Sequence, residues 1–188
     1  MTLTPMERAL EWLPANDDID RPQVTLSTVA PDGGPDARTV LLSSAGPEGV
    51  YFHTDAHSRK VRELLDDPRA VMTVLWPGFT RQLVIRGVAE LAGVDELASA
   101  YRARSPYLQQ LAWQNTREFA AQPLRDRVEQ WAEFAARHPL GFEQPDNWTG
   151  FLIRPDRLSF WTSNADAASQ RLEYTLGERG WLLEYLPG

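Results

Sequence analysis

The chain has 188 residues, an apolar fraction of 43% and a formal net charge of −7 at pH 7. This length is enough for one well-packed domain, and the negative charge argues against a general nucleic-acid binder, which needs a basic surface. Because the sequence has no cysteine, disulfides, thiolate zinc sites and thiol nucleophiles are excluded. Its histidines, His53, His57 and His138, lack the spacing of metal ligands, so we expect no metal site.

No segment predicts export or membrane insertion. Residues 1–13 lack the basic start and apolar run of a signal peptide. No apolar stretch approaches the ~20 residues that are needed to cross a bilayer. We therefore expect a soluble, cytoplasmic protein without a membrane partner.

The predicted elements begin with a helix and continue as strands. Thr4 and Pro5 are typical of a helix start, and apolar residues follow at helical spacing as far as Leu13. Alternating and β-branched residues then predict strands, with Gly and Pro clusters between them. The expected strands of this half are 23–30, 37–45, 50–53, 70–76 and 81–91, with a short helix at 58–66.

The second half of the chain starts with helices and returns to strands. Helices are expected at 94–104 and 123–138, the segment 107–119 is ambiguous, and strands are expected at 148–153, 158–162, 171–176 and 181–186. Because strands dominate at regular spacing, the sequence predicts a mainly β fold, an antiparallel barrel with helices packed on it. We expect a single domain over 1–188, with the barrel core in 23–91, a helical segment in 94–138 and carboxyl-terminal strands in 147–188.

Arg38 is the first candidate site residue, at the start of the strand segment RTVLLS. An arginine that enters a buried strand needs an anionic partner, because an unpaired buried charge is costly. That partner is either a bound anion or one of the 26 acidic side chains. The segment alone does not decide between them.

The run Ser58, Arg59 and Lys60 opens the predicted helix at 58–66. A helix start offers free backbone N–H groups and the positive end of the helix dipole. With a hydroxyl and two cations added, it becomes a candidate phosphate site. The alternative is an ordinary helix cap followed by solvated charges.

Three further residues are candidates for contacts with a planar ligand. The amide of Gln82 both donates and accepts hydrogen bonds, so it can bind the edge of a heterocycle. Trp161 could lie against a planar ring, and Arg171 could meet a phosphate or a ring oxygen. The alternatives are a surface residue for Gln82 and a core residue for Trp161.

Taken together and in this order, these segments resemble the pyridoxamine 5'-phosphate oxidase family. The similarity runs from about residue 23 to residue 186 and is carried by ARTVLL, HT, SRK, WPGFTRQLVIRG, WTGF and RPDRLSFW. The resemblance implies a split β-barrel and an obligate homodimer with FMN at the subunit interface. It also implies an FMN-dependent oxidoreductase that acts on a small molecule.

The resemblance assigns most of the cofactor-binding positions. In the family the strand that matches Arg38–Leu42 lies along the flavin, and the Thr and Ser-Arg-Lys positions bind its phosphate. His53 stands where the family usually has tyrosine, a change that keeps a polar ring. By count, Arg117 falls where the family's partner subunit supplies a glutamine. The implied FMN-binding residues are Arg38, Thr39, Val40, Leu41, Leu42, His53, Thr54, Ser58, Arg59, Lys60, Gln82, Arg117, Trp161 and Arg171.

The substrate-binding positions that the family uses are changed in this chain. Its substrate-phosphate lysine is Ser43, its Tyr-x-x-x-Arg keeps Tyr101 but ends in Ser105, and its Arg-Leu-His reads Ala-Ala-Ser. Because each lost charge-assisted bond is worth about 1.5–3 kcal/mol, efficient oxidation of pyridoxamine or pyridoxine phosphate is not expected. The candidate substrate contacts are Ser43, Tyr101, Arg104, Ser105, Ala167 and Ser169.

The leading hypothesis is an FMN-dependent oxidoreductase with a less anionic, larger or aromatic substrate, such as a secondary-metabolite ring. The closest alternative is a genuine pyridoxamine 5'-phosphate oxidase whose rearranged pocket uses Arg102 or Arg104. Two others are a non-catalytic FMN-binding protein and a barrel without a flavin. A deazaflavin user is also conceivable, although the Ser-Arg-Lys run and Trp161 argue for FMN.

Overall fold

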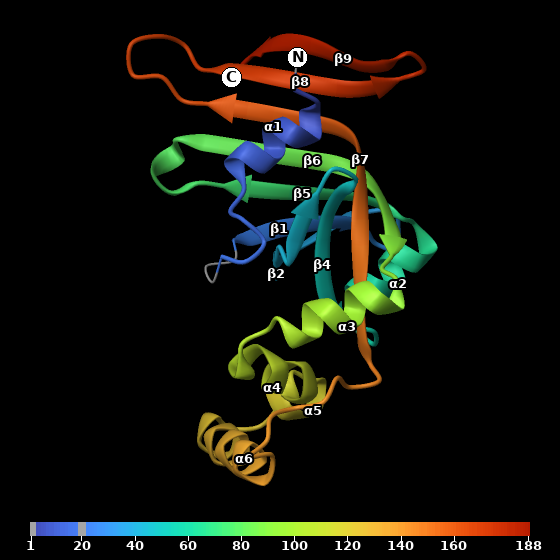
Figure 1. The fold of residues 1–188 in the computed structure, drawn as a ribbon, viewed down its shortest axis with the longest axis vertical. Helices are drawn as coiled ribbons and strands as arrows, with labels where there is room; N and C mark the ends of the chain where they lie inside the picture. Colours follow the sequence, from blue (N-terminus) through green and yellow to red (C-terminus); the bar gives the residue numbers. More distant parts are fainter. Residues whose placement is uncertain (1–2, 19–21) are drawn as a thin grey trace.

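The computed structural model describes residues 3–18 and 22–188 and shows a curled antiparallel sheet with helices on it and beyond it (Figure 1). Its path is β2-β1-β5-β6-β7-β4-β3, and β8 pairs with β7 and β9. The strands that the structure describes are β1 Gln23–Val29, β2 Pro35–Leu41, β3 Ser44–Gly46, β4 Gly49–Asp55, β5 Arg69–Leu75, β6 Arg81–Leu91, β7 Trp148–Thr162, β8 Gln170–Gly177 and β9 Gly180–Pro187.

β7 joins the two parts of the sheet. Its first residues, 148–153, pair with β4, and its last residues, 157–162, pair with β8. The prediction of two separate strands at 148–153 and 158–162 is therefore wrong. Pro155, which suggests a break, is accommodated at an irregularity in the pairing with β6, opposite Gly87. A glycine there leaves room for the backbone of β7 to approach closely, so the strand continues past the proline.

The first hairpin forms as predicted, but its second strand is shorter than the sequence suggests. β1 and β2 pair from Val29 opposite Pro35 to Gln23 opposite Leu41. The predicted strand at 37–45 is interrupted after Leu41, because the Leu42 side chain turns into the core and is 1% exposed. The chain then changes partner, and β3 pairs with β4.

The core lies inside the curled sheet and continues under the first helix. Phe52, Phe151 and Phe160 are fully buried and come from β4 and β7. Helix α1, Pro5–Trp12, lies against this barrel (Figure 1), and its Trp12 ring packs edge-on at 5.1 Å from the Phe160 ring. Thr4 caps the helix as predicted, by accepting a hydrogen bond from the Glu7 backbone.

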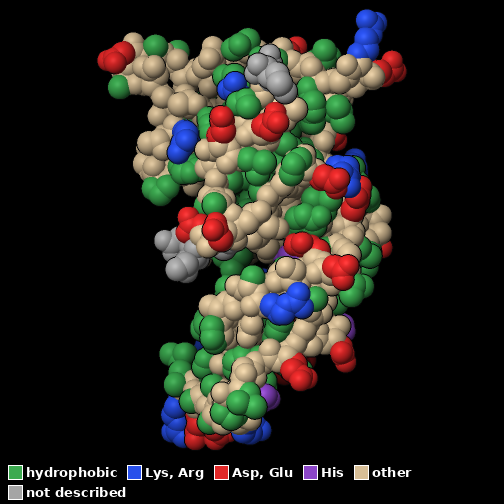
Figure 2. Space-filling model, viewed as in Figure 1, with side chains coloured by type: hydrophobic (Ala, Val, Ile, Leu, Met, Phe, Trp, Pro, Cys, Tyr) green, Lys and Arg blue, Asp and Glu red, His purple; other side chains and the backbone are tan. Residues whose placement is uncertain are grey.

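The remaining helices are α2 Arg59–Asp66, beside the barrel, and a helical arm that extends away from it (Figure 1). The arm consists of α3 Val94–Arg102, α4 Pro106–Gln114, α5 Arg117–Ala120 and α6 Leu124–Arg137, so the ambiguous segment 107–119 is largely helical. Aromatic contacts hold the arm together, including Trp131 at 5.3 Å from Tyr107. Charged side chains of both signs gather at its free end (Figure 2). No helix in the described part of the chain is long and apolar enough to cross a membrane.

Candidate functional site

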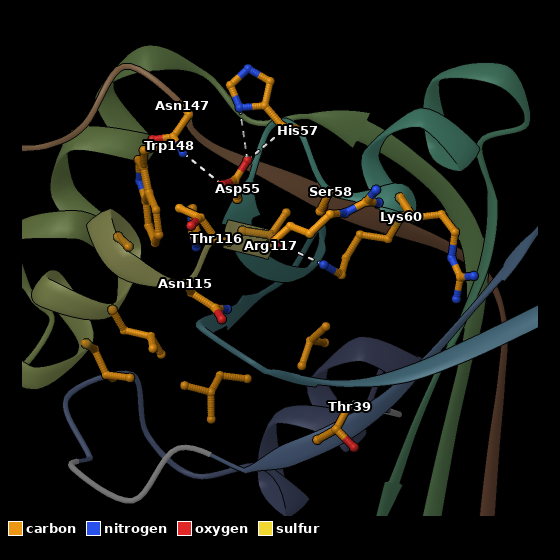
Figure 3. A pocket seen from close by; sticks show the side chains of 18 of the residues that line it. Thr39, Asp55, His57, Ser58, Lys60, Asn115, Thr116, Arg117, Asn147 and Trp148 are labelled. Carbon is orange, nitrogen blue, oxygen red and sulfur yellow. Dashed lines mark hydrogen bonds and ion pairs between the residues drawn. The ribbon is translucent and has the colours of Figure 1, made fainter. Parts of the chain in front are cut away.

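A cavity of about 720 Å³ lies where the barrel meets the helical arm (Figure 3). One wall is formed by β2 and β4 and by the start of α2. The start of β7, which pairs with β4, and α4, α5 and Arg104 complete the lining. Segments that are far apart in the sequence therefore meet at one place. The predicted cofactor-binding residues that line this cavity are Thr39, Val40, Leu41, His53, Thr54, Ser58, Arg59, Lys60 and Arg117.

The start of α2 forms the cationic end of the cavity. Ser58 occupies the cap position, and its buried Oγ has no hydrogen-bond partner in the part of the chain that the structure describes. The Lys60 ammonium donates to the Thr54 hydroxyl at 3.1 Å, and burial lowers the pKa of Lys60, with a further contribution from the charge of Arg38. Arg117 reaches the same place from α5 (Figure 3). Together with the free N–H groups of the first helical turn, this arrangement can bind a phosphate.

Arg117 lies at the cavity of its own chain. The family pattern places this position in the partner subunit, whereas here Arg117 lines the cavity formed by its own chain. The reason is the course of α4 and α5, which bring the chain back over the start of α2. Glu118, the next residue, lines the same cavity.

A network of charged residues lies behind the cationic end. Glu63, whose side chain is 1% exposed, accepts hydrogen bonds from Arg38 at 2.7 Å and from Thr28 at 2.6 Å. Asp36 pairs with Arg59 at 2.6 Å and with Arg38 at 3.0 Å. Of the two partners that the sequence allows for Arg38, the structure thus shows acidic side chains. Arg38 does not line the cavity, and its contacts instead join β1 and β2 to α2.

Leu42, a predicted cofactor-binding residue, does not lie at the cavity. Its side chain belongs to the barrel core rather than to the cavity. Thr39, Val40 and Leu41 line the cavity.

The other end of the cavity is built on an aromatic side chain that the sequence did not single out as a site residue. Trp148 stacks on the His53 ring, with centroids 5.3 Å apart and planes 6° apart. The Arg104 guanidinium lies 4.2 Å from the centroid of the Trp148 ring. Because His53 pairs with Gly150 in the β4–β7 ladder, Trp148 begins β7 two residues away. Trp148 reaches the site because β4 and β7 pair in this register.

Burial controls the charge of this stack. It lowers the pKa of His53 to about 4, helped by the positive charge of Arg104, so the imidazole is neutral at pH 7. Burial also lowers the pKa of Arg104 to about 10, which leaves the guanidinium charged. Both ring nitrogens of His53 are buried without a hydrogen-bond partner among the described residues.

Three predicted cofactor-binding residues lie elsewhere in the sheet. Gln82 pairs with Trp161, and Trp161 pairs with Arg171, so the three form a row across β6, β7 and β8. None of them lines the cavity. A single chain therefore does not bring this row to the start of α2.

Of the predicted substrate contacts, only Arg104 lines the cavity. The Tyr101 hydroxyl donates to the backbone oxygen of Glu143 at 2.8 Å, and the Ser105 hydroxyl caps α4 by accepting from the Leu108 N–H. Ser43 lies between β2 and β3, where its N–H donates to the Tyr51 oxygen. The other two predicted contacts lie in the connection between β7 and β8, namely Ala167 and Ser169.

The sequence matches two family models that together span most of the chain. Residues 11–139 match Pyridoxamine 5'-phosphate oxidase, and residues 148–187 match Pyridoxine 5'-phosphate oxidase C-terminal dimerisation region. A pyridoxine/pyridoxamine 5'-phosphate oxidase from Thermobifida fusca is 35% identical over 97% of this chain and 87% of its own length. A pyridoxine/pyridoxamine 5'-phosphate oxidase from Neisseria meningitidis serogroup C is 32% identical over 97% of this chain and 88% of its own length.

Solved structures share the fold at lower identity. PhzG from Burkholderia lata, in complex with tetrahydrophenazine-1-carboxylic acid, has a TM-score of 0.76 at 22% identity, over 96% of this chain and 86% of its own. An FMN-binding protein from Nostoc punctiforme, related to pyridoxamine 5'-phosphate oxidase, also has a TM-score of 0.76, at 17% identity over 99% of both chains.

These similarities confirm two predictions, the split barrel with helices and the oxidoreductase class. The matched regions include the start of α2, where the cationic end of the cavity lies, and the row on β6, β7 and β8. The family pattern therefore extends over both parts of the predicted site. The chain belongs to the pyridoxamine 5'-phosphate oxidase family.

Proposed function

We propose that this chain is an FMN-dependent oxidase that works as a homodimer on a substrate other than pyridoxamine or pyridoxine phosphate. One observation carries the proposal: the cavity has several cationic and hydroxyl groups at the start of α2, whereas among the described residues the Trp148 end has one cation, Arg104, without an ion-pair partner. The first end suits the phosphate of a flavin. The second end lacks the set of donors that a substrate phosphate needs.

The side chains at the start of α2 fit the phosphate tail of FMN. The unpartnered Ser58 Oγ is a buried hydroxyl that a phosphate oxygen would satisfy. Lys60, held by Thr54, and Arg117 would supply charge from two sides, while Thr39, Val40 and Leu41 would lie along the ring system. Bound FMN would supply the two-electron oxidation, and the protein would orient the substrate and exclude water.

The homodimer is proposed because the row of Gln82, Trp161 and Arg171 lies away from the cavity. Trp161 and Arg171 belong to the segment that matches the family's dimerisation region, residues 148–187. If a second copy places this row over the open side of the cavity, each site is completed by both subunits. The remaining implied contacts to the flavin ring would then come from the partner.

The substrate proposal follows from the loss of basic groups. Ser43 and Ser105 replace the residues that would bind a substrate phosphate, and the exposed connection after β7 carries Ala167 and Ser169 instead of an arginine and a histidine. Leu108, Leu111 and Ala112 add an apolar wall near Arg104. This combination favours a larger or aromatic substrate that carries less negative charge.

The proposed function is tested in two steps with the purified full-length protein. The absorption spectrum, followed by mass spectrometry of the released cofactor, should identify FMN. Turnover of pyridoxamine phosphate is then compared with that of the Thermobifida fusca relative under the same conditions. We expect a rate at least about 100-fold lower for this chain, because several charge-assisted bonds are missing. A colourless protein that ignores added FMN would refute the cofactor assignment.

A second candidate is a genuine pyridoxamine 5'-phosphate oxidase. It is favoured by the names of the relatives at 32–35% identity and by the position of Arg104 in the cavity, one residue from the family's arginine. The same turnover comparison separates the candidates. A rate close to that of the Thermobifida fusca relative would establish the second candidate in place of the first.

A further inference from the structure

The cationic side chains that α2 and α5 contribute to the cavity differ in their partners. These side chains are Arg59, Lys60, Arg62 and Arg117. Among the described residues, Arg59 is the one member of this set that forms an ion pair with an acidic side chain. The Lys60 ammonium instead donates to the hydroxyl of Thr54. One cation of the cavity is therefore already bound to a carboxylate of the protein.

Asp36 is the acidic residue that lies closest to the Arg59 guanidinium. Its Oδ2 is 2.6 Å from Arg59 and 3.0 Å from Arg38, so one oxygen contacts both arginines. Its Oδ1 accepts a hydrogen bond from the Ala37 N–H at 2.8 Å. Asp36 belongs to β2 and pairs with Thr28 of β1. The β1–β2 hairpin thus holds this carboxylate beside the first residue of α2.

The contact between Asp36 and Arg59 is the exposed part of the charged network. Glu63, with a side chain that is 1% exposed, neutralises Arg38 at 2.7 Å and approaches Arg59 no closer than 3.5 Å. The Arg59 side chain is 67% exposed and lines the cavity. Water weakens an ion pair in such a position. An anion in the cavity can therefore compete for Arg59 without disturbing the pair of Arg38 and Glu63.

The network as a whole adds no net charge to the cavity. The positive charges of Arg38 and Arg59 are balanced by the negative charges of Asp36 and Glu63. A phosphate monoester carries close to two negative charges at neutral pH, and it forms its strongest hydrogen bonds with cationic donors. As long as Arg59 is bound to Asp36, a phosphate must displace this carboxylate or bind without the guanidinium.

We infer that Asp36 competes with a bound phosphate for Arg59 and thereby lowers the affinity of the α2 end of the cavity for FMN. This inference rests on the proposed function, because it names a residue that tunes the same phosphate site. Ser58, Lys60 and Arg117 bind the phosphate whether or not Asp36 is present. Arg59 adds its charge to theirs only when Asp36 releases it.

The inference is tested with the variant Asp36→Asn, which removes the charge and keeps an oxygen that can accept from the Ala37 N–H. Flavin-free protein is titrated with FMN and with riboflavin, which lacks the phosphate, while flavin fluorescence is followed. The dissociation constant for FMN should fall about 3- to 10-fold, and that for riboflavin should change by less than about twofold. Inorganic phosphate, titrated calorimetrically, should bind more tightly by a similar factor.

The variant Arg59→Met shows whether the gain depends on Arg59. In the wild-type background it should weaken FMN binding by less than about threefold, because Asp36 occupies the guanidinium. In the Arg59→Met background, Asp36→Asn should change the FMN affinity by less than about twofold. A gain that is as large without Arg59 as with it would overturn the competition and would indicate a general effect of charge.

Asp66→Asn is the matched control for the change of charge. Asp66 is the exposed last residue of α2, it does not line the cavity, and it forms no ion pair in the described part of the chain. Its variant should leave the FMN affinity unchanged. The thermal midpoint of each variant is measured first, and Asp36→Ser replaces Asp36→Asn if that protein does not fold.

The outcomes distinguish this inference from the proposed function. Unchanged or weaker binding of FMN and phosphate by Asp36→Asn would overturn the role of Asp36 even if the wild-type protein binds FMN. If the wild-type protein binds inorganic phosphate but not FMN, the cofactor assignment is wrong, and the phosphate titrations of the same variants still decide the role of Asp36. A protein that binds neither anion would overturn both.

Discussion

The two ends of the cavity hold their cations in different ways. At the start of α2, basic side chains stand in front of a network in which acids neutralise Arg38 and Arg59. At the other end, Arg104 lies on an aromatic ring and forms no ion pair with a described acidic side chain. The first arrangement fixes the position of several donors, and the second leaves one charge uncompensated.

This difference suggests that the two ends bind different kinds of ligand. A network of paired charges is rigid and suits a cofactor that stays bound, because its contacts are supported from behind. An uncompensated cation on a fixed platform suits a substrate that binds and leaves. Substitutions at each end should therefore affect different properties of the protein.

The largest effect on the free energy of unfolding is expected from breaking the Arg38–Glu63 pair next to the start of α2. Glu63→Leu would leave Arg38 partly buried without its closest carboxylate, and breaking a buried pair in this way costs about 3–5 kcal/mol. Urea unfolding monitored by tryptophan fluorescence should show this loss. The double variant Arg38→Leu, Glu63→Leu should recover most of it, because no buried charge then remains unpaired. A single-variant loss below about 1 kcal/mol would mean that the network does not hold α2.

The matched control for this pair is an exposed one. Arg69 and Asp67 form an ion pair at 2.5 Å on the surface, with the Arg69 side chain 73% exposed. Arg69→Met should change the free energy of unfolding far less than Glu63→Leu does, because water screens an exposed pair. The contrast isolates burial, rather than ion pairing as such, as the source of the large effect.

The second effect concerns pH at the Trp148 end. Folding lowers the pKa of His53 from 6.5 to about 4, so the neutral imidazole contributes stability that is fully present above pH 6.5. That contribution is lost as the pH falls from 6.5 towards 4. Relative to His53→Leu, which has no titrating group, the wild-type protein should lose about 3 kcal/mol over this window. Unfolding free energies of both proteins at several pH values measure the difference, and parallel curves would contradict it.

The third effect is on cofactor affinity. Lys60→Met removes one charge-assisted bond to a phosphate, which should weaken FMN binding by about 10- to 100-fold, or about 1.4–2.7 kcal/mol. Quenching of flavin fluorescence on titration into apoprotein gives the dissociation constant. Arg125→Met, on the exposed surface of α6, is the control and should leave it unchanged. Equal affinities for Lys60→Met and wild type would place the phosphate elsewhere.

The sequence predicts the fold and the cationic end well because their signals are local. Alternation and turn residues mark the strands, and the run Ser58, Arg59 and Lys60 marks the start of α2 by itself. Even the cap at Thr4 follows from neighbouring residues. These features depend on contacts between residues a few positions apart.

The features that sequence reasoning missed depend on contacts between distant segments. Arg38 and Glu63 are separated by 25 positions, and nothing in either segment indicates which acid the arginine meets. Trp148 joins the site because β7 pairs with β4 and the end of α3 brings Arg104 over its ring. The continuity of β7 past Pro155 depends on Gly87 of another strand. The pairing register between strands is not encoded in any one segment. The Trp148 end of the cavity therefore could not be predicted from a local motif.

A substitution at Gly150 tests that register directly. A Cβ at Gly150 would lie 2.9 Å from the His53 Nε2 and 3.0 Å from the Phe52 backbone oxygen, so Gly150→Ala should force the imidazole to shift on Trp148. Overpacking of this kind costs about 1–3 kcal/mol. Gly46→Ala, where a Cβ would meet nothing within 4 Å, is the control. Because the network next to α2 is untouched, Gly150→Ala should lower the free energy of unfolding while it leaves FMN affinity unchanged. A Gly150→Ala protein that also lost FMN affinity would show that the two ends of the cavity are coupled rather than independent.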